Sequence, residues 1–423
     1  MRAVVVGGGL AGLAAALELA GRGHEVTVLE ARPTLGGAVQ TLPEREGDPS
    51  PPPDNGQHIA LGCFTAYLDF LRRIGKADGV ARSRLSLPVV DERGRWSRVE
   101  PGPLGLLRYR HLSARDRLGV ARAVRALARL EPGDHDRETF GSVLRRLGSS
   151  DAAIDRFWDV FVRPALNLRT DEASAAPGIF TVRTALLGPR SASDLLLPRE
   201  PLGELHGAAA GRALERLGAS VRLHARVAEL DEDAAVLADG ERVEGDAFVV
   251  AVPPRESARL LGEPEPALED SPIASVHLLL DRRVLEPPLA ALVGSRAHWV
   301  FDRGRLTGRE PERGQYLTVV SSGAPELLEL RGRALVDAVA GELVERLGGA
   351  EVLWSRVSRE PAATFAARPG TEALRPGPDT ARPNVARAGA WTATGWPATM
   401  EGAVRSGLAA AGVLSDVATK VAA

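Results

Sequence analysis

Ala3-Val4-Val5-Val6-Gly7-Gly8-Gly9-Leu10-Ala11-Gly12 decides the fold of this chain. Its first four residues form a short apolar run, which is typical of a central parallel strand buried on both faces. The rest matches the spacing G-x-G-x-x-G, in which Gly7 permits a tight turn, Gly9 lets the backbone approach a pyrophosphate, and Gly12 lets a helix pack close to the strand. The free N–H groups at the start of that helix would favour negative charge. The stretch therefore predicts a dinucleotide-binding unit.

The residues that follow complete this unit. Leucines and alanines continue as a helix that is expected to end near Gly21, and residues 25–29 return as a second strand. Glu30 closes that strand 18 residues beyond Gly12, where a carboxylate can accept hydrogen bonds from a ribose. A signal peptide is not expected here, because cleavage would destroy a complete nucleotide-binding unit.

A glycine pair after the second strand indicates which dinucleotide binds. Residues 32–37 read R-P-T-L-G-G, which resembles the flavin amine-oxidase and carotenoid-desaturase superfamily, whose glycine pair lies against FAD. Ala38 stands where that superfamily usually places an arginine, so one pyrophosphate contact is expected to be missing. The sequence holds no second G-x-G-x-x-G, so we expect no built-in NADPH domain. The flavin must then exchange electrons with the substrate, with oxygen or with an external donor.

Composition excludes several other classes of function. A net charge of −2 and 4% aromatic residues offer little to nucleic acid. Cys63 is the only cysteine, so no intrachain disulfide can form, and a reducing cytoplasm is expected. The eight histidines lack metal-ligand spacing, so no metal site is expected. No apolar run is long enough to span a bilayer, which predicts a soluble or peripheral protein.

The expected fold is α/β, with a discontinuous Rossmann-like FAD-binding domain and an inserted α+β substrate-binding domain. Length supports two domains, because 423 residues exceed what one core usually organises. Strand-like runs between residues 219 and 252, with Asp239-Gly240 as a hairpin turn, mark a return to the cofactor domain. The expected segments are 1–75, 201–264 and 381–423 for the FAD-binding domain, 76–200 for a mainly helical cap, and 265–380 for the substrate-binding sheet.

Residues 108–129 allow two interpretations. Seven arginines and one aspartate accompany Leu118, Val124, Leu127 and Leu130 at helical spacing. A basic amphipathic helix can lie on anionic lipid at the inner face of the cell membrane. A packed helix with a solvated face is favoured, because the chain uses arginine in place of lysine almost everywhere.

The C-terminal segment 388–407 predicts a strand, a turn and a helix close to the flavin. Thr399 suits the N-cap of this helix, and the N–H groups from Met400 onward would stabilise negative charge on the reduced ring. The superfamily normally ends the preceding strand with Gly-Asp or Gly-Glu, whereas Gly389 is followed here by Ala390. The contact that the acidic side chain would make with the cofactor must therefore be absent or replaced. The alternative is a buried helix start rich in tryptophan.

Four segments in order resemble the squalene-associated FAD-dependent desaturase family, the hydroxysqualene dehydroxylases: residues 54–63, 164–176, 272–279 and 391–407. The resemblance implies reductive removal of a hydroxyl from hydroxysqualene, giving squalene for hopanoid or related triterpenoid synthesis. It implies a hydrophobic isoprenoid substrate and an external electron donor. The superfamily also usually meets the adenine at the position of Val227. The cofactor contacts expected on these grounds are Gly7, Gly9, Leu10, Ala11, Gly12, Glu30, Ala31, Arg32, Gly36, Gly37, Ala38, Gly56, Val227, Gly389, Thr399 and Met400.

Loss of an allylic hydroxyl as water requires a proton donor near the flavin. His58 and Asp54 are the candidates, with Gln57 placed to orient either one. Both could instead be structural, with Asp54 capping a turn and His58 bonding to backbone. His277, on an apolar alternating segment, is expected to be a core histidine whose hydrogen bonds are satisfied.

Three other functions remain open at this point. Carotenoid desaturation needs the same flavin and the same apolar cavity, with hydride flowing the other way. Amine oxidation is disfavoured, because Lys76 and Lys420 are the only lysines and no late cysteine is present. A non-catalytic FAD-binding protein that carries or senses isoprenoid would keep its flavin unchanged on meeting the lipid.

Overall fold

The computed structural model describes residues 1–422, with side chains described as far as Asp416. A five-stranded sheet has the order β18-β12-β1-β2-β8, and all its strands are parallel. The strands are β1 (Arg2–Val6), β2 (Glu25–Leu29), β8 (Ser220–Arg222), β12 (Ala247–Val250) and β18 (Val385–Arg387). Three distant parts of the sequence therefore complete one sheet, and the α/β fold with a discontinuous Rossmann-like unit is confirmed.

Both faces of this sheet are covered, as the continuous apolar run of β1 requires. Ala3 and Val5 pack under helices, whereas Val4 and Val6 pack under a small three-stranded sheet and one further helix. The elements of the first face are α1 (Leu10–Gly21), α2 (Thr65–Arg73), α9 (Ala209–Arg216) and α13 (Met400–Ala422). Those of the second are β9 (Val227–Leu230), β10 (Ala234–Leu237), β11 (Arg242–Glu244) and α10 (Pro254–Leu261). The expected turn at Asp239-Gly240 joins β10 to β11.

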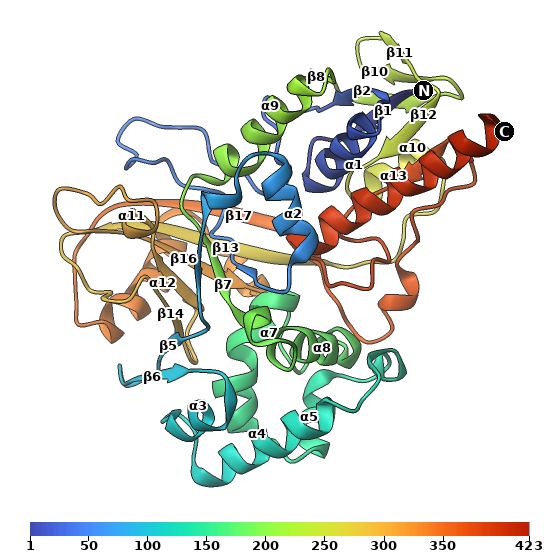
Figure 1. The fold of residues 1–423 in the computed structure, drawn as a ribbon. Helices are drawn as coiled ribbons and strands as arrows, with labels where there is room; N and C mark the ends of the chain where they lie inside the picture. Colours follow the sequence, from blue (N-terminus) through green and yellow to red (C-terminus); the bar gives the residue numbers. More distant parts are fainter. Residues whose placement is uncertain (423) are drawn as a thin grey trace.

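Helices α1 and α13 lie side by side although they come from opposite ends of the chain (Figure 1). A Cβ atom on Gly407 would stand 2.1 Å from the carbonyl oxygen of Ala11, so only glycine permits this approach. The contact brings the C-terminal helix onto the helix that follows the glycine turn.

A seven-stranded sheet has the order β17-β13-β16-β15-β14-β5-β6. Neighbouring strands are antiparallel except β14 and β5. Its strands are β5 (Leu87–Val90), β6 (Trp96–Val99), β13 (Asp270–Leu280), β14 (Leu289–Leu292), β15 (Trp299–Asp302), β16 (Gln315–Ser322) and β17 (Val352–Phe365). One face packs on α12 (Gly332–Arg346), and the other faces a group of helices. Strands β5 and β6 come from the segment expected to be mainly helical, so that segment also supplies an edge of the sheet.

The helices of that segment lie at the end of the molecule opposite the two termini (Figure 1). They are α3 (Gly102–Arg108), α4 (Ala114–Leu127), α5 (Phe140–Arg146), α6 (Asp151–Ala153), α7 (Asp159–Leu166) and α8 (Ala175–Thr181). The remaining α-helix is α11 (Arg303–Leu306), and the remaining strands β3 (Ala60–Leu61), β7 (Leu195–Pro198) and β4 (Val80–Ser83) form a three-stranded sheet. Nothing in this arrangement tests the expected domain boundaries, which remain a prediction. Among the described helices, none is both long and apolar enough to cross a membrane.

The arginine-rich segment 108–129 is not one helix. Helix α3 ends at Arg108, and α4 begins after Ser113, whose side chain accepts from the backbone N–H of Asp116 while the Asp116 carboxylate accepts in return from Ser113. The expectation that Leu118 lies on the apolar face of this helix was wrong, because Leu118 is exposed. Val120 and other small residues are buried instead. Helix α4 therefore packs through Gly119, Val120, Ala123 and Leu127, whereas Leu118 and most of its arginines are exposed.

Candidate active site

The glycine turn and the glycine pair meet in the folded chain. The N–H of Gly36 donates to the carbonyl oxygen of Gly8 over 2.8 Å, and Gly9 and Gly36 form a parallel bridge. A Cβ atom on Gly37 would stand 2.7 Å from the Cα of Gly9, and one on Gly12 would stand 1.9 Å from a carbonyl oxygen of the turn. Bare backbone therefore forms the surface where a pyrophosphate and a flavin can approach, and the residues present fit FAD.

Helix α1 presents its positive end to that surface. Gly9 is its N-cap and supplies no side chain, and no acidic residue lies in its first turn. The first N–H groups of a helix have no partner within the helix, so those of Leu10 and Ala11 can donate to phosphate oxygens.

Glu30 stands at the end of β2 and is buried. Its carboxylate accepts from the N–H of Gly8 over 2.7 Å and from the N–H of Arg32 over 2.8 Å. These two bonds tie the glycine turn to the chain after β2. A carboxylate has about four acceptor positions, so two remain for ribose hydroxyl groups.

The segment after the glycine pair leads to residues 54–58 through one side chain. Asn55 donates to the carbonyl oxygen of Ala38 over 2.7 Å and accepts from the N–H of Gln40 over 3.3 Å. These bonds tie the segment that holds Gly56 to the loop that follows the glycine pair. The exposed methyl group of Ala38 offers no charge to a phosphate, as the sequence indicated.

Gly389 lies two residues after the end of β18 and therefore at the same edge of the parallel sheet as the glycine turn. Its N–H donates to Ser406 of α13, and a Cβ atom there would stand 2.3 Å from the indole nitrogen of Trp391. Val227 lies in β9 and shares an apolar cluster with Val6 and other ends of the same strands. The expected contact residues from the distant segments thus converge on one edge of the sheet.

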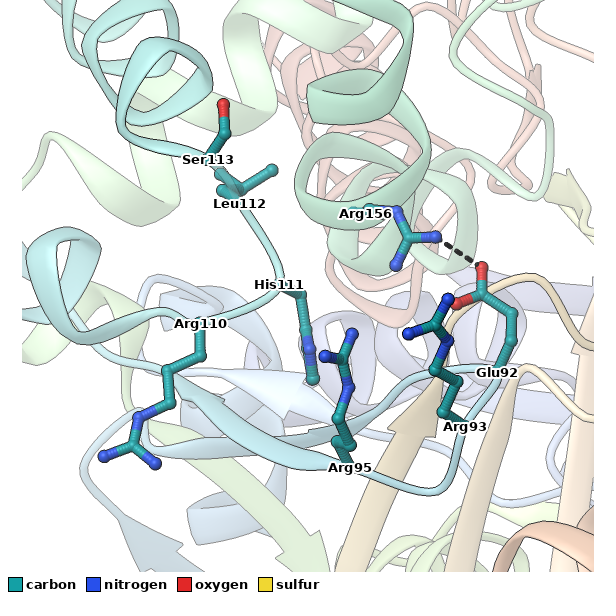
Figure 2. A pocket seen from close by; sticks show the side chains of 8 residues that line it. All are labelled: Glu92, Arg93, Arg95, Arg110, His111, Leu112, Ser113 and Arg156. Carbon is teal, nitrogen blue, oxygen red and sulfur yellow. Dashed lines mark hydrogen bonds and ion pairs between the residues drawn. The ribbon is translucent and has the colours of Figure 1, made fainter.

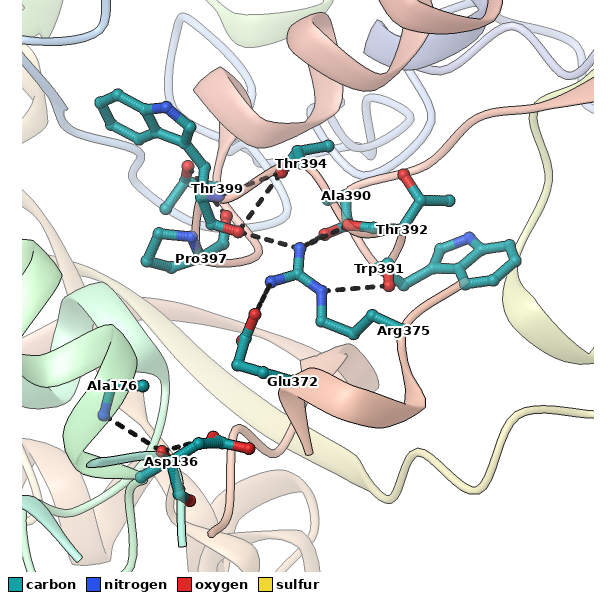
Figure 3. A network of polar contacts seen from close by, with 12 residues as sticks. Asp136, Ala176, Glu372, Arg375, Ala390, Trp391, Thr392, Thr394, Pro397 and Thr399 are labelled. Atoms are coloured by element: carbon teal, nitrogen blue, oxygen red, sulfur yellow. Dashed lines mark hydrogen bonds and ion pairs between the residues drawn. The ribbon is translucent and has the colours of Figure 1, made fainter. Parts of the chain in front are cut away.

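Arg375 organises the loop between β18 and α13 (Figure 3). Its buried guanidinium donates to the carbonyl oxygens of Thr392 (2.5 Å), Trp396 (2.9 Å) and Ala390 (3.3 Å). It also forms an ion pair of 2.9 Å with Glu372, and burial raises the pKa of this carboxyl. Sequence reasoning missed Arg375, since nothing distinguishes it among so many arginines.

The start of α13 has the expected cap. The Oγ1 of Thr399 accepts from the N–H of Gly402 over 3.3 Å, which leaves the N–H groups of Met400 and Glu401 directed out of the helix start. The fully buried carboxylate of Glu401 accepts from the N–H groups of Ala66 (3.1 Å) and Tyr67 (2.8 Å) at the start of α2. Glu401 therefore fixes α13 against α2, a role that the sequence did not indicate.

Asp54 is held by three partners from three parts of the chain. It accepts from the hydroxyl of Thr41 (2.7 Å) and the N–H of Leu202 (3.0 Å), and it forms a buried ion pair with Arg303 (2.5 Å). This bonding favours the structural alternative for Asp54. Its side chain joins three segments, and a role as a proton donor stays a prediction.

His58 and Gln57 are half-buried and next to the Gly56 backbone. The Nδ1 of His58 lies 3.4 Å from the carbonyl oxygen of Gly56, and burial lowers the pKa of the imidazole. No described residue forms a hydrogen bond with the side chain of Gln57. Both side chains thus remain available, and their catalytic roles stay predictions.

His206 was not singled out by the sequence. Its Nδ1 lies 2.9 Å from the carbonyl oxygen of Leu202 and its Nε2 lies 2.8 Å from the hydroxyl of Tyr67. A neutral imidazole with the proton on Nδ1 satisfies both partners. Burial lowers its pKa to about 3, consistent with that neutral form.

A single row of side chains crosses one face of the seven-stranded sheet, and the side chains change from polar to apolar along it. Residues directly opposite one another in an antiparallel pair point to the same face. The row runs Arg356, His277, Thr318, Phe301, Leu289 from β17 to β14. Its first three members are polar, whereas Phe301 and Leu289 belong to the apolar cluster shared with α4, α5, α7 and α8. The face is thus polar at one end and apolar at the other.

Residues 48–56 cover the polar end of this row. Arg356 forms a buried ion pair with Asp48, and a Cβ atom on Gly56 would stand 3.0 Å from the hydroxyl of Ser275, which neighbours His277 on the same face. His277 bonds to Thr318 through Nδ1 (3.0 Å), but its buried Nε2 has no partner among the described residues. His277 is therefore buried in the core as expected, and its Nδ1 is the ring nitrogen with a clear hydrogen-bond partner. Buried polar atoms of Gln40, Ser275, Arg303 and Tyr316 are likewise unpaired in the described part of the chain.

Comparisons with known proteins agree with this geometry. The family model of flavin containing amine oxidoreductases matches residues 10–415. The hydroxysqualene dehydroxylases of Sinorhizobium fredii and Rhodopseudomonas palustris are each 32% identical to this chain, over 96% of both sequences. The 15-cis-phytoene desaturase of Solanum lycopersicum is 27% identical over 98% of this chain and 77% of its own length. Among solved structures, an oxidoreductase from Methanosarcina mazei superposes with a TM-score of 0.74 at 16% identity, covering 96% of this chain and 99% of its own.

Proposed function

Because this chain belongs to the flavin containing amine oxidoreductase family, as an FAD-dependent oxidoreductase related to squalene and carotenoid desaturases, we propose that it converts hydroxysqualene to squalene by reductive dehydroxylation. The observation that carries the proposal is the similarity to two hydroxysqualene dehydroxylases over nearly the full length of each. Squalene made in this way would supply hopanoid or related triterpenoid synthesis. An external donor would reduce the flavin.

The row across the seven-stranded sheet supports a substrate with one polar group on a long hydrocarbon. Its polar end, at His277 and Thr318, lies under the segment that carries His58. Its apolar end, at Phe301 and Leu289, continues into the cluster formed with the helices. A hydroxyl placed at the polar end would leave the hydrocarbon chain over the apolar end, where burial is favourable.

The reaction needs a proton and a hydride, and water leaves. FAD held at the glycine turn and the glycine pair would, once reduced, supply the hydride for the carbon that loses the hydroxyl. The imidazolium of His58 would supply the proton to the departing hydroxyl, with the Gly56 carbonyl oxygen orienting the ring. The free N–H groups of Met400 and Glu401 at the start of α13 would stabilise negative charge at the ring edge. Gln57 would hold the hydroxyl in line with His58.

Carotenoid desaturation is the second candidate, because phytoene desaturases are similar over almost the whole chain. Amine oxidation has less support. Lys76 is ion-paired with Glu200, and Lys420 lies outside the residues whose side chains are described.

Product analysis separates these functions. We would incubate the FAD-loaded protein and a chemical reductant with hydroxysqualene and, separately, incubate the oxidised protein with phytoene. Squalene from the first mixture and unchanged phytoene from the second are expected. Desaturated phytoene, without any squalene, would replace the proposal by the second candidate.

A further inference from the structure

We infer that β6, α3 and the first turns of α4 form a docking surface for an anionic lipid bilayer. The docking surface consists of apolar side chains, Trp96, Leu104, Leu107 and Leu118, and of arginines, Arg93, Arg95, Arg98, Arg108, Arg110 and Arg115. The inference does not depend on the proposed function, because it concerns a face of the molecule at the end opposite the two termini (Figure 1).

The apolar side chains are exposed and gathered. Leu104 and Leu107, one turn apart on α3, are 66% and 63% exposed, and Leu118 on α4 is 58% exposed. Trp96 on β6 is 42% exposed, and α3 packs against both β6 and α4. These are four of the nine large hydrophobic residues exposed in the described chain. Isolated exposed leucines are ordinary, whereas a gathered set indicates a contact surface.

The packing of helix α3 against the protein does not depend on Leu104 or Leu107. Gly105 is its only fully buried residue, and a Cβ atom there would stand 2.2 Å from the carbonyl oxygen of Glu100. The backbone of α3 at Gly105 therefore packs directly against the residue that follows β6. Leu104 and Leu107 remain free for a partner.

The surrounding charge is strongly positive although the whole chain is slightly negative. Residues 91–129 hold ten arginines and four carboxylates, against a net charge of −2 for the chain. Three of these carboxylates are engaged locally: Asp91 pairs with Arg95, Glu92 pairs with Arg156, and Asp116 caps α4. Five arginines of the docking surface have no ion pair within the described residues, namely Arg93, Arg98, Arg108, Arg110 and Arg115.

A hollow of about 550 Å³ is lined by Arg93, Arg95 and Arg110 of the docking surface. Figure 2 shows the guanidinium groups of Arg93, Arg95 and Arg156 turned toward one another, with Arg110 pointing away. Buried His111 lines the hollow and is held in place, because its Nε2 lies 3.0 Å from the carbonyl oxygen of Val89. Planar guanidinium groups bind phosphate through paired hydrogen bonds, so the hollow can take a lipid headgroup.

The combination of leucines and arginines selects a lipid bilayer over other anionic partners. Arginines attract anionic headgroups, and apolar side chains beside them enter the boundary with the acyl chains. Single-stranded nucleic acid would need a series of aromatic platforms, and Trp96 is the only aromatic residue on the docking surface.

Co-sedimentation of the FAD-loaded protein with vesicles tests the inference. Wild-type protein should bind phosphatidylcholine vesicles containing phosphatidylglycerol and should bind pure phosphatidylcholine much more weakly. L104S/L107S should weaken binding at least about tenfold, because two apolar anchors are lost. R93Q/R110Q should weaken binding by about ten- to thirtyfold and should reduce its dependence on salt.

Matched variants on other elements control for general effects. L217S/L353S alters two other exposed leucines, and R313Q/R331Q alters two other exposed arginines, so both should bind as wild type does. Flavin absorbance and the thermal midpoint of each variant show that it folds. Failure of the wild-type protein to bind, or equal binding by folded L104S/L107S, would overturn the inference. Loss of vesicle binding to competing single-stranded RNA, with L104S/L107S binding RNA normally, would overturn it in favour of nucleic acid.

Discussion

Gly37 lies so close to Gly9 that a Cβ atom on Gly37 would stand 2.7 Å from the Gly9 Cα. The residues come from different turns, and their contact creates the bare backbone surface on which FAD can lie. A methyl group at Gly37 would separate the two turns.

Gly37→Ala should therefore reduce FAD affinity. We expect a loss of at least about tenfold, since a shift of one turn by a few tenths of an ångström removes well-aligned phosphate contacts. Gly47→Ala is the matched control, because Gly47 also has a positive φ, +83° against +61°, but its added methyl group would meet no atom. Titration of the apoproteins with FAD measures both. Equal affinity of the two variants would show that the contact of Gly37 with Gly9 does not shape the cofactor site.

Arg375→Met should destabilise the protein and promote loss of flavin. The change leaves Glu372 and several backbone carbonyl oxygens without their buried partner, a cost of about 3–5 kcal/mol. Arg368→Met, which breaks the solvent-exposed ion pair with Glu269, should cost about 1 kcal/mol or less. Urea unfolding measures the free energies of unfolding. The rise in flavin fluorescence on release of FAD shows whether the loop between β18 and α13 still holds the cofactor. If the two variants unfold alike, Arg375 does not hold the loop in place.

His58→Gln should slow the reaction and remove the fall in rate that accompanies rising pH. Burial lowers the pKa of His58 below its ordinary value near ~6.5, so the charged, proton-donating form increases as pH falls through that lowered pKa. The rate constant of flavin reoxidation should rise toward low pH in the wild type, and loss of a general acid should reduce it by about 10²–10⁴. The pH profile of H58Q should be flat over the same range.

Asp54→Asn distinguishes positioning from catalysis. It weakens the buried ion pair with Arg303, so the free energy of unfolding should fall while the shape of the pH profile stays that of the wild type. Loss of the pH-dependent fall in rate in D54N, with that fall retained in H58Q, would assign the proton donor to Asp54 instead.

Buried neutral histidines should make the fold sensitive to mild acid. Burial lowers the pKa of His206 and of His277 to about 3, and that of His298 well below its ordinary value. Below pH ~6.5 these histidines bind protons in the unfolded chain but stay neutral in the folded chain. Stability is therefore greatest near neutrality and falls as pH decreases from ~6.5, by up to about 1.4 kcal/mol per histidine for each pH unit.

Urea unfolding at a series of pH values measures this slope. His277→Gln should lower the slope by one histidine's share, whereas His224→Gln, which changes an exposed histidine, should leave it unchanged. Carboxylates such as Glu138, whose pKa its Arg146 partner lowers to about 2, contribute only at lower pH. An unfolding free energy independent of pH between ~6.5 and ~5 would contradict the assignment of neutral buried histidines.

Local features of the site could be predicted from the sequence. The glycine turn, the strand that ends at Glu30, the turn at Asp239-Gly240 and the cap at Thr399 depend on residues within a few positions of one another. In each case the backbone requirement selects a small set of residue types. These short-range requirements are sufficient to identify the cofactor domain.

Long-range polar contacts could not be predicted. The ion pair of Asp54 with Arg303, the contact of Glu401 with α2 and the row from Arg356 to Leu289 each join residues that are distant in sequence. With arginine at nearly every basic position, no local pattern singled out Arg375 or Arg303. The sequence indicated only part of the docking surface: residues 108–129 contain Leu118 and three of its arginines, whereas the exposed leucines of α3 lie just before that segment.

A single-turnover experiment tests the central claim most directly. The FAD-loaded protein is reduced without oxygen and mixed with hydroxysqualene, and flavin absorbance and lipid products are followed together. We expect the oxidised flavin spectrum to return as squalene appears in equal amount. A flavin that stays reduced, with hydroxysqualene recovered unchanged, would contradict it.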